Sequence, residues 1–196
     1  MRIRRIFRPA PTDPRRWGRF AVGLTAAAGA TLLAVALPAE LFGSAPPESP
    51  WTTAAAEVQV LDGDTLRLGG RLLRLHGLDV PERGHATCPG GRDPARDCAG
   101  AAAEALVRLV AGRVVQCRVQ RRDAQGRALG VCRAQPAGQA TADDGVELNA
   151  SLMAAGWAMA AAGALPALVL LEAAARRDGR GLWAADATPP EAWRRF

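Results

Sequence analysis

The clearest pattern of apolar and polar positions lies between residues 58 and 82, where the two kinds of side chain alternate with the period of a β-strand. The apolar positions of two short strands are Val58, Val60, Leu66 and Leu68. Gly69-Gly70 is a turn signal, and further leucines follow it at positions 73, 75 and 78. This segment therefore predicts short strands joined by a turn, with one face of each strand buried.

Helical and strand-like patterns alternate through the rest of the chain. Helical spacing occurs over 99–111, 147–155 and 164–177, and glycine follows each of these segments closely. Two further strands are expected over 113–120 and 127–133, with a polar turn between them. Residues 83–98 are expected to form a loop, and 188–196 an irregular tail. Five strands, one helix after the third strand and two closing helices predict a small α+β domain with a curled sheet.

The N-terminal region has a different pattern, because residues 20–39 carry no charge. Twenty helical residues span about 30 Å, the thickness of a bilayer core. The basic segment 1–19 precedes this stretch, so we expect a signal-anchor in the bacterial inner membrane with the later residues outside the cytoplasm. A cleaved signal peptide ending near Leu37-Pro38-Ala39, which would give a secreted protein, and a buried core helix are the alternatives.

The domain boundaries follow from these segments. Residues 40–56 are rich in Pro, Ser and Thr and are expected to form a linker. The folded domain is then expected over 57–187, with the tail after it.

The net charge of +6 comes from one end of the chain. Residues 1–19 contain seven Arg and one Asp, whereas residues 20–196 contain equal numbers of Arg and acidic residues. The overall charge therefore says nothing about a substrate. Residues 113–133 are locally basic, with six Arg and one Asp, and could face a polyanion.

The four cysteines allow three pairings. Cys117 and Cys132 lie on successive expected strands around one turn, and Cys88 and Cys98 enclose one irregular loop. An exported domain permits disulfides, so two bonds are expected among Cys88, Cys98, Cys117 and Cys132, and the sequence leaves their pairing open. Free buried thiols are the main alternative, and a zinc site has little support because no pair of cysteines has ligand spacing.

Four acidic residues lie where the strands of residues 58–82 are expected to end: Asp62, Asp64, Asp79 and Glu82. Gathered carboxylates are costly unless a positive charge lies among them. A hard divalent cation with oxygen ligands is one solution, and Arg74 is a second partner. The alternative is that the acids are ordinary turn residues, which explains Asp62 well and the other three poorly.

Several short motifs occur together in this chain. They are D-G-D-T-L-R-L, R-L-H-G-L-D-V-P-E, D-A-Q-G-R-A-L-G, V-E-L-N-A-S-L-M-A-A-G-W-A and G-R-G-L-W. In order and spacing, over roughly residues 57–185, the chain resembles the thermonuclease (staphylococcal nuclease) family, and its four cysteines are similar to those of exported and membrane-anchored bacterial members. The resemblance implies an OB-fold, a five-stranded β-barrel with three helices.

The resemblance also implies a site and a reaction. Asp64 and Asp79 would bind Ca²⁺ through their carboxylates and Val80 through its carbonyl, with Asp62 as an outer acid. Glu82 would act on the attacking water, and Arg74 and Arg127 would bind the phosphate. The expected activity is calcium-dependent hydrolysis of DNA and RNA with low sequence preference, which leaves 3′-phosphate and 5′-hydroxyl ends. The protein is expected to act as a monomer.

Three departures from the family pattern concern substrate binding. Val80 replaces the usual Thr, and Gln125 and Ala161-Ala162 stand where members often carry Tyr. This chain has no Tyr and no Lys; the arginines at 92, 96, 121 and 122 are candidate replacements for lysines near the site. The rival interpretation is an OB module that binds nucleic acid or protein without catalysis.

Overall fold

The computed structural model describes residues 48–90, 93–138 and 145–194. Its strands are β1 (Trp51–Thr53), β2 (Val58–Asp62), β3 (Thr65–Leu68), β4 (Arg71–Leu75), β5 (Leu78–Asp79), β6 (Thr87–Gly90), β7 (Asp93–Asp97), β8 (Arg113–Arg122), β9 (Ala128–Pro136), β10 (Val146–Glu147) and β11 (Met159–Ala160). Its helices are α2 (Cys98–Val110), α3 (Leu148–Ala154), α4 (Pro166–Arg177) and α5 (Pro190–Trp193), with 3₁₀ turns η2 (Ala55–Glu57) and η3 (Gly181–Trp183). The fold is therefore mixed α+β, as expected.

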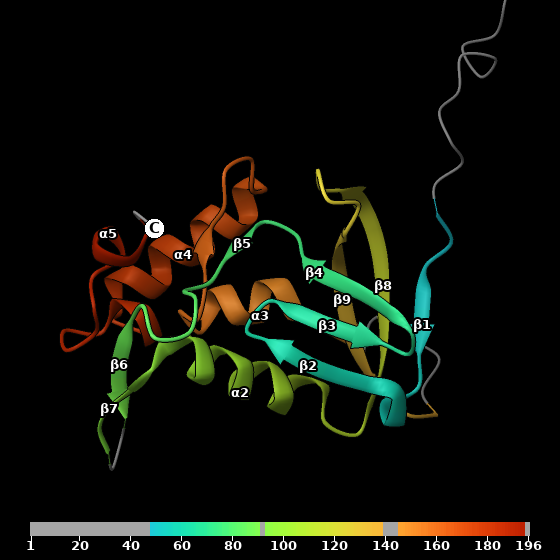
Figure 1. Ribbon diagram of the computed structural model, residues 1–196, viewed down its shortest axis with the longest axis horizontal. Helices are drawn as coiled ribbons and strands as arrows, with labels where there is room; N and C mark the ends of the chain where they lie inside the picture. The colour runs from blue at the N-terminus through green and yellow to red at the C-terminus, as the bar shows by residue number, and fades with distance from the viewer. Residues whose placement is uncertain (1–47, 91–92, 139–144, 195–196) are drawn as a thin grey trace, which may run out of the picture. The chain divides into compact units, whose positions relative to one another are not determined.

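One mixed sheet contains seven of these strands, and β5–β11 and β6–β7 form separate pairs. Its order is β1-β8-β9-β4-β3-β2, with β10 added on β9, and only the β4–β9 pair is parallel (Figure 1). Within the described part of the chain, β1 and β2 end this sheet and do not pair with each other. The described residues therefore form an open sheet with more than the five strands expected and no closed barrel, an arrangement consistent with an OB-like fold.

The main core lies on the inner face of this sheet. The leucines that set the alternating pattern are buried, with Leu66 and Leu73 at 0 % exposure. Val115 of β8 belongs to the same apolar cluster, so distant parts of the sheet share one core. Leu106 places α2 against this core, and Figure 1 shows that helix running along β2. The alternation in residues 58–82 thus identified one buried face correctly.

Residues 40–56 are not linker throughout, because the strand β1 lies within them. Trp51 pairs with Cys117 of β8, and the compact unit that contains the domain begins at Glu48. Trp51 is 9 % exposed, and the guanidinium of Arg71 stacks 4.4 Å from its ring centroid. Three residues after a proline-rich segment are too few to show a strand period, so the sequence pattern missed this edge strand.

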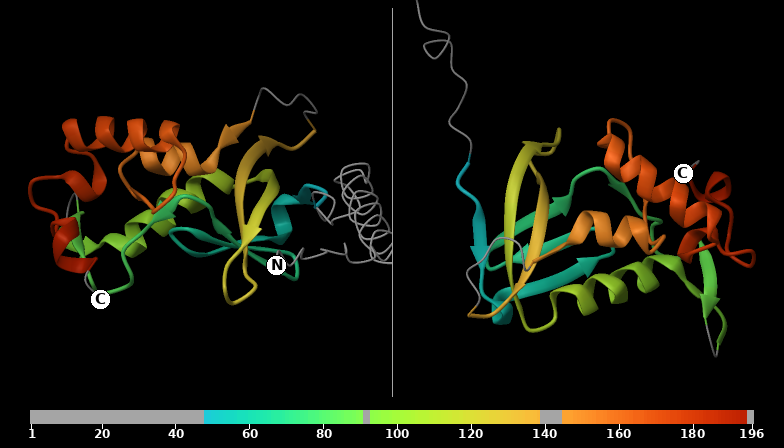
Figure 2. Two further views of the ribbon diagram at one scale, coloured as in Figure 1. Left: turned by 90° about the horizontal axis from the view of Figure 1, so that it is seen from above. Right: turned by 180° about the vertical axis from the view of Figure 1, so that it is seen from behind.

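Two other expected irregular segments also contain regular structure. The loop expected over 83–98 includes the β6–β7 hairpin, which projects from the domain in Figure 2. The tail expected over 188–196 includes α5, whose Trp193 is 5 % exposed. Both segments are short and contain proline, so neither has enough apolar repeats to indicate an element. The described residues include no helix long and apolar enough to cross a bilayer, and the span expected over 20–39 lies outside them.

Two disulfides are present, as expected, and the structure gives the pairing that the sequence left open. Cys117 and Cys132 face each other directly across the β8–β9 ladder, inside the main core. Cys88 and Cys98 join the β6–β7 hairpin to the start of α2. No cysteine is free, so neither alternative applies. The second disulfide belongs to a smaller apolar cluster, here called the second core, made of Ala86, Cys88, Cys98, Met159, Leu182 and Trp193.

Candidate active site

The turn between β2 and β3 fixes Asp64. A Cβ on Gly63 would lie 2.6 Å from the Cβ of Ala102 and 2.8 Å from a methyl carbon of Val80. No larger residue fits between α2 and the Val80 segment without moving one of them. The sequence Asp-Gly-Asp thus allows the turn to pack against the helix, and this packing holds Asp64 directly before the start of β3.

Asp64 is buried, with an exposure of 5 %, and forms a close ion pair. Nε of Arg74 donates to its Oδ2 at 2.6 Å, and the Thr65 hydroxyl donates to its Oδ1 at 2.7 Å. The ladder places Arg74 opposite Thr65, so the sheet register itself brings the guanidinium to the carboxylate. A buried carboxylate requires such partners, because burial without them costs several kcal/mol or more.

Asp123 organises the turn that presents Arg127. Its Oδ1 accepts hydrogen bonds from the backbone N–H groups of Gln125 and Arg127, at 3.0 and 2.9 Å. Its Oδ2 accepts from Nε of Arg127 at 2.6 Å. Gly126 completes the turn with a φ of +78°, which favours glycine. Desolvation raises the pKa of Asp123, but the hydrogen bonds and charge of Arg127 outweigh it and lower that pKa.

Asp79 belongs to a different part of the fold. It pairs with Met159 in the β5–β11 bridge. Its Oδ2 accepts a hydrogen bond from Nε of Arg194 at 2.9 Å, and Nη2 of Arg194 donates to the Ala160 carbonyl at 3.4 Å. The Asp79 and Arg194 side chains are 34 % and 42 % exposed. Arg194 follows α5, so an element beyond the expected domain reaches a predicted metal ligand.

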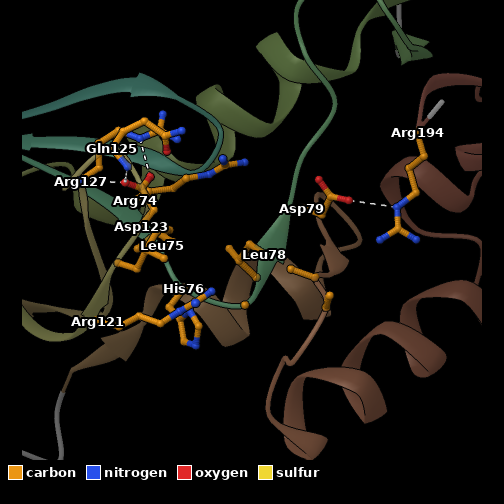
Figure 3. Close-up of a pocket in the computed structure, with 14 residues that line it drawn as sticks. Arg74, Leu75, His76, Leu78, Asp79, Arg121, Asp123, Gln125, Arg127 and Arg194 are labelled. Atoms are coloured by element: carbon orange, nitrogen blue, oxygen red, sulfur yellow. Dashed lines mark hydrogen bonds and ion pairs between the residues drawn. The ribbon is translucent and has the colours of Figure 1, made fainter. Parts of the chain in front are cut away.

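A pocket of about 300 Å³ unites most of the predicted site. Six of the seven expected residues line it: Asp62, Asp64, Arg74, Val80, Glu82 and Arg127. Asp79 lines two neighbouring pockets, of about 420 and 150 Å³, and Arg74 borders all three. In Figure 3, Arg74, Asp123, Gln125 and Arg127 gather on one side of the pocket of about 420 Å³, and Asp79 and Arg194 lie on the other.

The two remaining acids of the pocket are exposed. The Glu82 side chain is 85 % exposed, and one of its carboxylate oxygens lies 3.8 Å from Nδ1 of His85. The Asp62 side chain is 56 % exposed, and its Oδ1 accepts from Nε of Arg83 at 3.2 Å. Both carboxylates are thus at the surface of the pocket, where solvent and a substrate can reach them.

His76 lines the pocket of about 420 Å³, beside Arg121 (Figure 3). Burial, and then the positive charge of Arg121, lower the pKa of this histidine. The His76 carbonyl accepts a hydrogen bond at 2.8 Å from Nδ2 of Asn149, which is 1 % exposed. Asn149 also bonds to β9, through the Gly130 carbonyl and the Cys132 N–H. This buried amide ties α3 to β9 and to the connection between β4 and β5.

The donor set fits a hard cation in its chemistry. Carboxylates and a backbone carbonyl are the ligands that Ca²⁺ prefers, and Asp64 and Val80 share one pocket with two further acids. Among the described residues, however, no three His, Cys, Asp or Glu side chains are arranged to hold a metal ion. Asp64 and Asp79 instead each bond to an arginine. The expected acids are therefore brought near one another without forming a ready-made cage.

Sequence reasoning missed two residues of this region. Asp123 was treated as part of a polar turn, although the Asp-x-x-Gly spacing is a known signal for a side chain that bonds its own turn. Arg194 was placed in an irregular tail, and no local pattern indicates that it reaches Asp79 across 115 positions of sequence. The first could have been found from the turn chemistry, and the second required the fold.

Comparison with known proteins identifies the family of the chain. Residues 72–185 match the family model described as staphylococcal nuclease homologue. The chain is also 33 % identical over 144 residues to a protein of Escherichia coli O157:H7 and to one of Escherichia coli, each described as an uncharacterized endonuclease. Each alignment covers 70 % of this chain and 82 % of the relative. The chain therefore belongs to the family of staphylococcal nuclease homologues.

Proposed function

We propose that this protein is a calcium-dependent phosphodiesterase that hydrolyses DNA and RNA with little sequence preference and leaves 3′-phosphate and 5′-hydroxyl ends. Its family membership makes it a nuclease, that is, a phosphodiester hydrolase. The observation that carries the finer proposal is the pocket in which Arg74 and Arg127 lie with Asp62, Asp64, Val80 and Glu82.

Arg74 and Arg127 would bind the phosphate. An Arg side chain offers a planar set of donors that matches two phosphate oxygens at once. Each uses Nε to bond an aspartate, which orients the side chain. Extra negative charge develops on these phosphate oxygens in the transition state, so oriented donors lower the barrier more than they strengthen ground-state binding.

Glu82 would accept a proton from the attacking water. The water oxygen forms a new bond to phosphorus, and the bond from phosphorus to the 5′ oxygen breaks. The departing oxygen takes a proton from solvent and becomes the 5′-hydroxyl, while the phosphate stays on the 3′ side. The exposed position of Glu82 in the pocket allows water to reach it.

Asp64, Asp79 and the Val80 carbonyl would hold the calcium ion. Bound there, the ion would neutralise charge on the phosphate and lower the pKa of a coordinated water. Both aspartates now bond to arginines, so binding would require at least one carboxylate oxygen to exchange its partner.

The direct test is digestion of single-stranded DNA and RNA by the full-length protein with Ca²⁺ and with a chelator. We expect cleavage only with Ca²⁺, and 3′-phosphate ends that a phosphatase can remove. Glu82→Gln and Arg127→Ala should each lower kcat/KM by about 10²- to 10³-fold. Arg67→Gln is a matched control, because Arg67 is exposed on β3 and lines none of the three pockets. Binding of the strand without cleavage in either condition would favour the rival binding module.

We also propose that residues 20–39 anchor the chain in the bacterial inner membrane, with the domain outside the cytoplasm as a monomer. Two disulfides support an oxidising compartment. Membrane fractionation and the intact mass of the purified protein test this proposal. A protein lacking about its first 39 residues and found free in the medium would instead indicate a cleaved signal.

A further inference from the structure

A second hollow lies on the outer face of the β8–β9 pair, beyond the candidate active site. It has a volume of about 310 Å³ and is lined by Pro50, Gln116, Arg118, Gln120, Val131, Arg133, Glu147 and Leu165. None of these residues lines the pockets that hold the predicted catalytic groups. We call this hollow the β8–β9 groove.

The sheet register connects the groove to the active site. Paired residues of a ladder lie on the same face, and every second residue of a strand returns to that face. Leu129 pairs with Arg121 on one side and with Arg74 on the other. Two residues farther along β9, Val131 pairs with Arg118, and after two more Arg133 pairs with Gln116. These three sets of paired residues, here called rows, share one face of the sheet. The first row, which contains Leu129 and Arg121, borders the active-site pocket.

Burial supports this assignment of faces. Cys132 and Ala134 of β9 are fully buried in the main core, as are Val115 and Cys117 of β8. Gln116 and Arg118, which alternate with these buried residues on β8, are exposed. A register shift between Val119 and Arg121 then brings Arg121 to the outer face together with Arg118. The β-bulge therefore places the two arginines on one face, although three positions separate them.

No acidic side chain within the described structure neutralises Arg118 or Arg121. Neither Arg118 nor Arg121 forms an ion pair or hydrogen bond with another described residue. Nη2 of Arg133 bonds to the Gly145 carbonyl, but its Nε is buried without an acceptor. The acid in the groove is Glu147, whose carboxylate accepts from the N–H of Ala150 at the start of α3. The surface therefore favours an anionic partner.

The spacing of the rows favours a single strand. Rows two residues apart are about 7 Å apart along the sheet. A flexible single strand can extend so that its successive phosphates follow such a straight series of contacts, whereas the phosphates of a duplex strand turn around the helix axis as they advance by roughly 3.4 Å per base pair. The described groove residues include no aromatic side chain, which leaves Gln116, Gln120 and Val131 to contact sugars and bases without a strong base preference.

We propose that the β8–β9 groove binds the part of a single-stranded nucleic acid that extends beyond the cleaved bond, with Arg121 and Arg118 contacting successive phosphates. The proposal rests on the proposed nuclease function and adds a path for the substrate outside the catalytic pocket. A strand of eight nucleotides should therefore bind more tightly than a dinucleotide. Arg118 should contribute to binding of the eight-nucleotide strand and not to binding of the dinucleotide.

The test measures binding of labelled thymidine strands of two and eight nucleotides to the full-length protein in chelator, by fluorescence anisotropy. Arg118→Gln should weaken the eight-nucleotide complex several-fold, leave the dinucleotide complex unchanged, and lower the slope of log K against log salt by about 0.7. Arg67→Gln is the matched control, because Arg67 is an exposed strand arginine without an ion pair among the described residues, and it should change neither complex.

Three results would overturn the proposal. They are an unchanged eight-nucleotide complex in Arg118→Gln, an equal loss for both lengths, and an equal loss when the strand is paired with its complement. Thermal unfolding of Arg118→Gln should match wild type, because the side chain is exposed. If wild type binds the longer strand through Arg118 yet never cleaves it with Ca²⁺, the nuclease proposal fails and the groove remains.

Discussion

The two aspartates expected to bind the metal ion are held in different ways. Asp64 is nearly buried and bonds to Arg74, which the sheet register places beside it. Asp79 is one-third exposed and bonds to Arg194, from the far end of the described chain. The first pair is part of the sheet, whereas the second depends on the packing of a short terminal helix. The Asp64–Arg74 pair is thus held in place by the sheet, and we call it the fixed side of the site. The Asp79–Arg194 pair can more easily exchange partners, and we call it the exchangeable side.

The largest expected effect concerns the fixed side. Asp64→Asn keeps the size of the side chain but removes its charge, so it loses both a predicted metal ligand and the partner of Arg74. We expect kcat/KM with Ca²⁺ to fall by about 10²- to 10³-fold. Asp62→Asn, in the same pocket but exposed and paired with Arg83, should lose less than about tenfold. Equal losses would show that burial does not distinguish the two acids.

The next effect concerns the link between the two sides. Asn149 holds the carbonyl of His76, which lies between the strand of Arg74 and the bridge of Asp79. Asn149→Ala removes three hydrogen bonds at a buried position, so the free energy of unfolding should fall by roughly 3 kcal/mol. Urea unfolding measures this change. Ser151→Ala, on the same helix but partly exposed, is the control and should cost about 1 kcal/mol.

A smaller effect is expected on the exchangeable side. Arg194→Gln frees Asp79, so Ca²⁺ should bind more tightly by up to about 1 kcal/mol, the size expected for a partly exposed ion pair. Isothermal calorimetry with Ca²⁺ alone gives this value without relying on activity. Arg177→Gln breaks an exposed pair with Asp178 away from the site and should change nothing. Weaker Ca²⁺ binding in Arg194→Gln would mean that this arginine helps to shape the metal site.

The smallest effect is a pH dependence from His76. Its pKa is lowered in the folded protein, so the unfolded chain binds the additional proton more readily. The stability contributed by the neutral side chain is complete above the unfolded pKa of about 6.5 and declines as the pH falls below it. Urea unfolding at pH 7.5 and 5.5 should show a larger loss for wild type than for His76→Asn. An identical loss in the two proteins would remove His76 as the cause.

The sequence predicted the fixed side well, because its information is local. Alternation placed Leu66 and Leu73 in the core, and the same alternation placed Arg74 outside it. The Asp-Gly-Asp turn and the family motifs then named Asp64. These residues lie within one hairpin, where strand period and turn chemistry decide the structure.

The exchangeable side could not be predicted, because it is formed by contacts between distant segments. β1 and α5 contain three and four residues, too few for a period to emerge. Trp193 is buried only because the second core receives it, and Arg194 follows from that packing. The resemblance gave the expected acids but not the additional strands. The strand β1, which pairs with β8, lies outside the motifs, and β10, which pairs with β9, is only the first two residues of one motif.

The Cys88–Cys98 bond has a consequence for how firmly the two halves of the site are held. It lies in the second core with Met159 and Trp193, on which the Asp79–Arg194 pair depends, whereas the Cys117–Cys132 bond lies in the main core, on which the Asp64–Arg74 pair depends. Each half of the site is thus tied to its own covalent cross-link, so selective reduction of Cys88–Cys98 would loosen the surroundings of Asp79 and leave those of Asp64 in place.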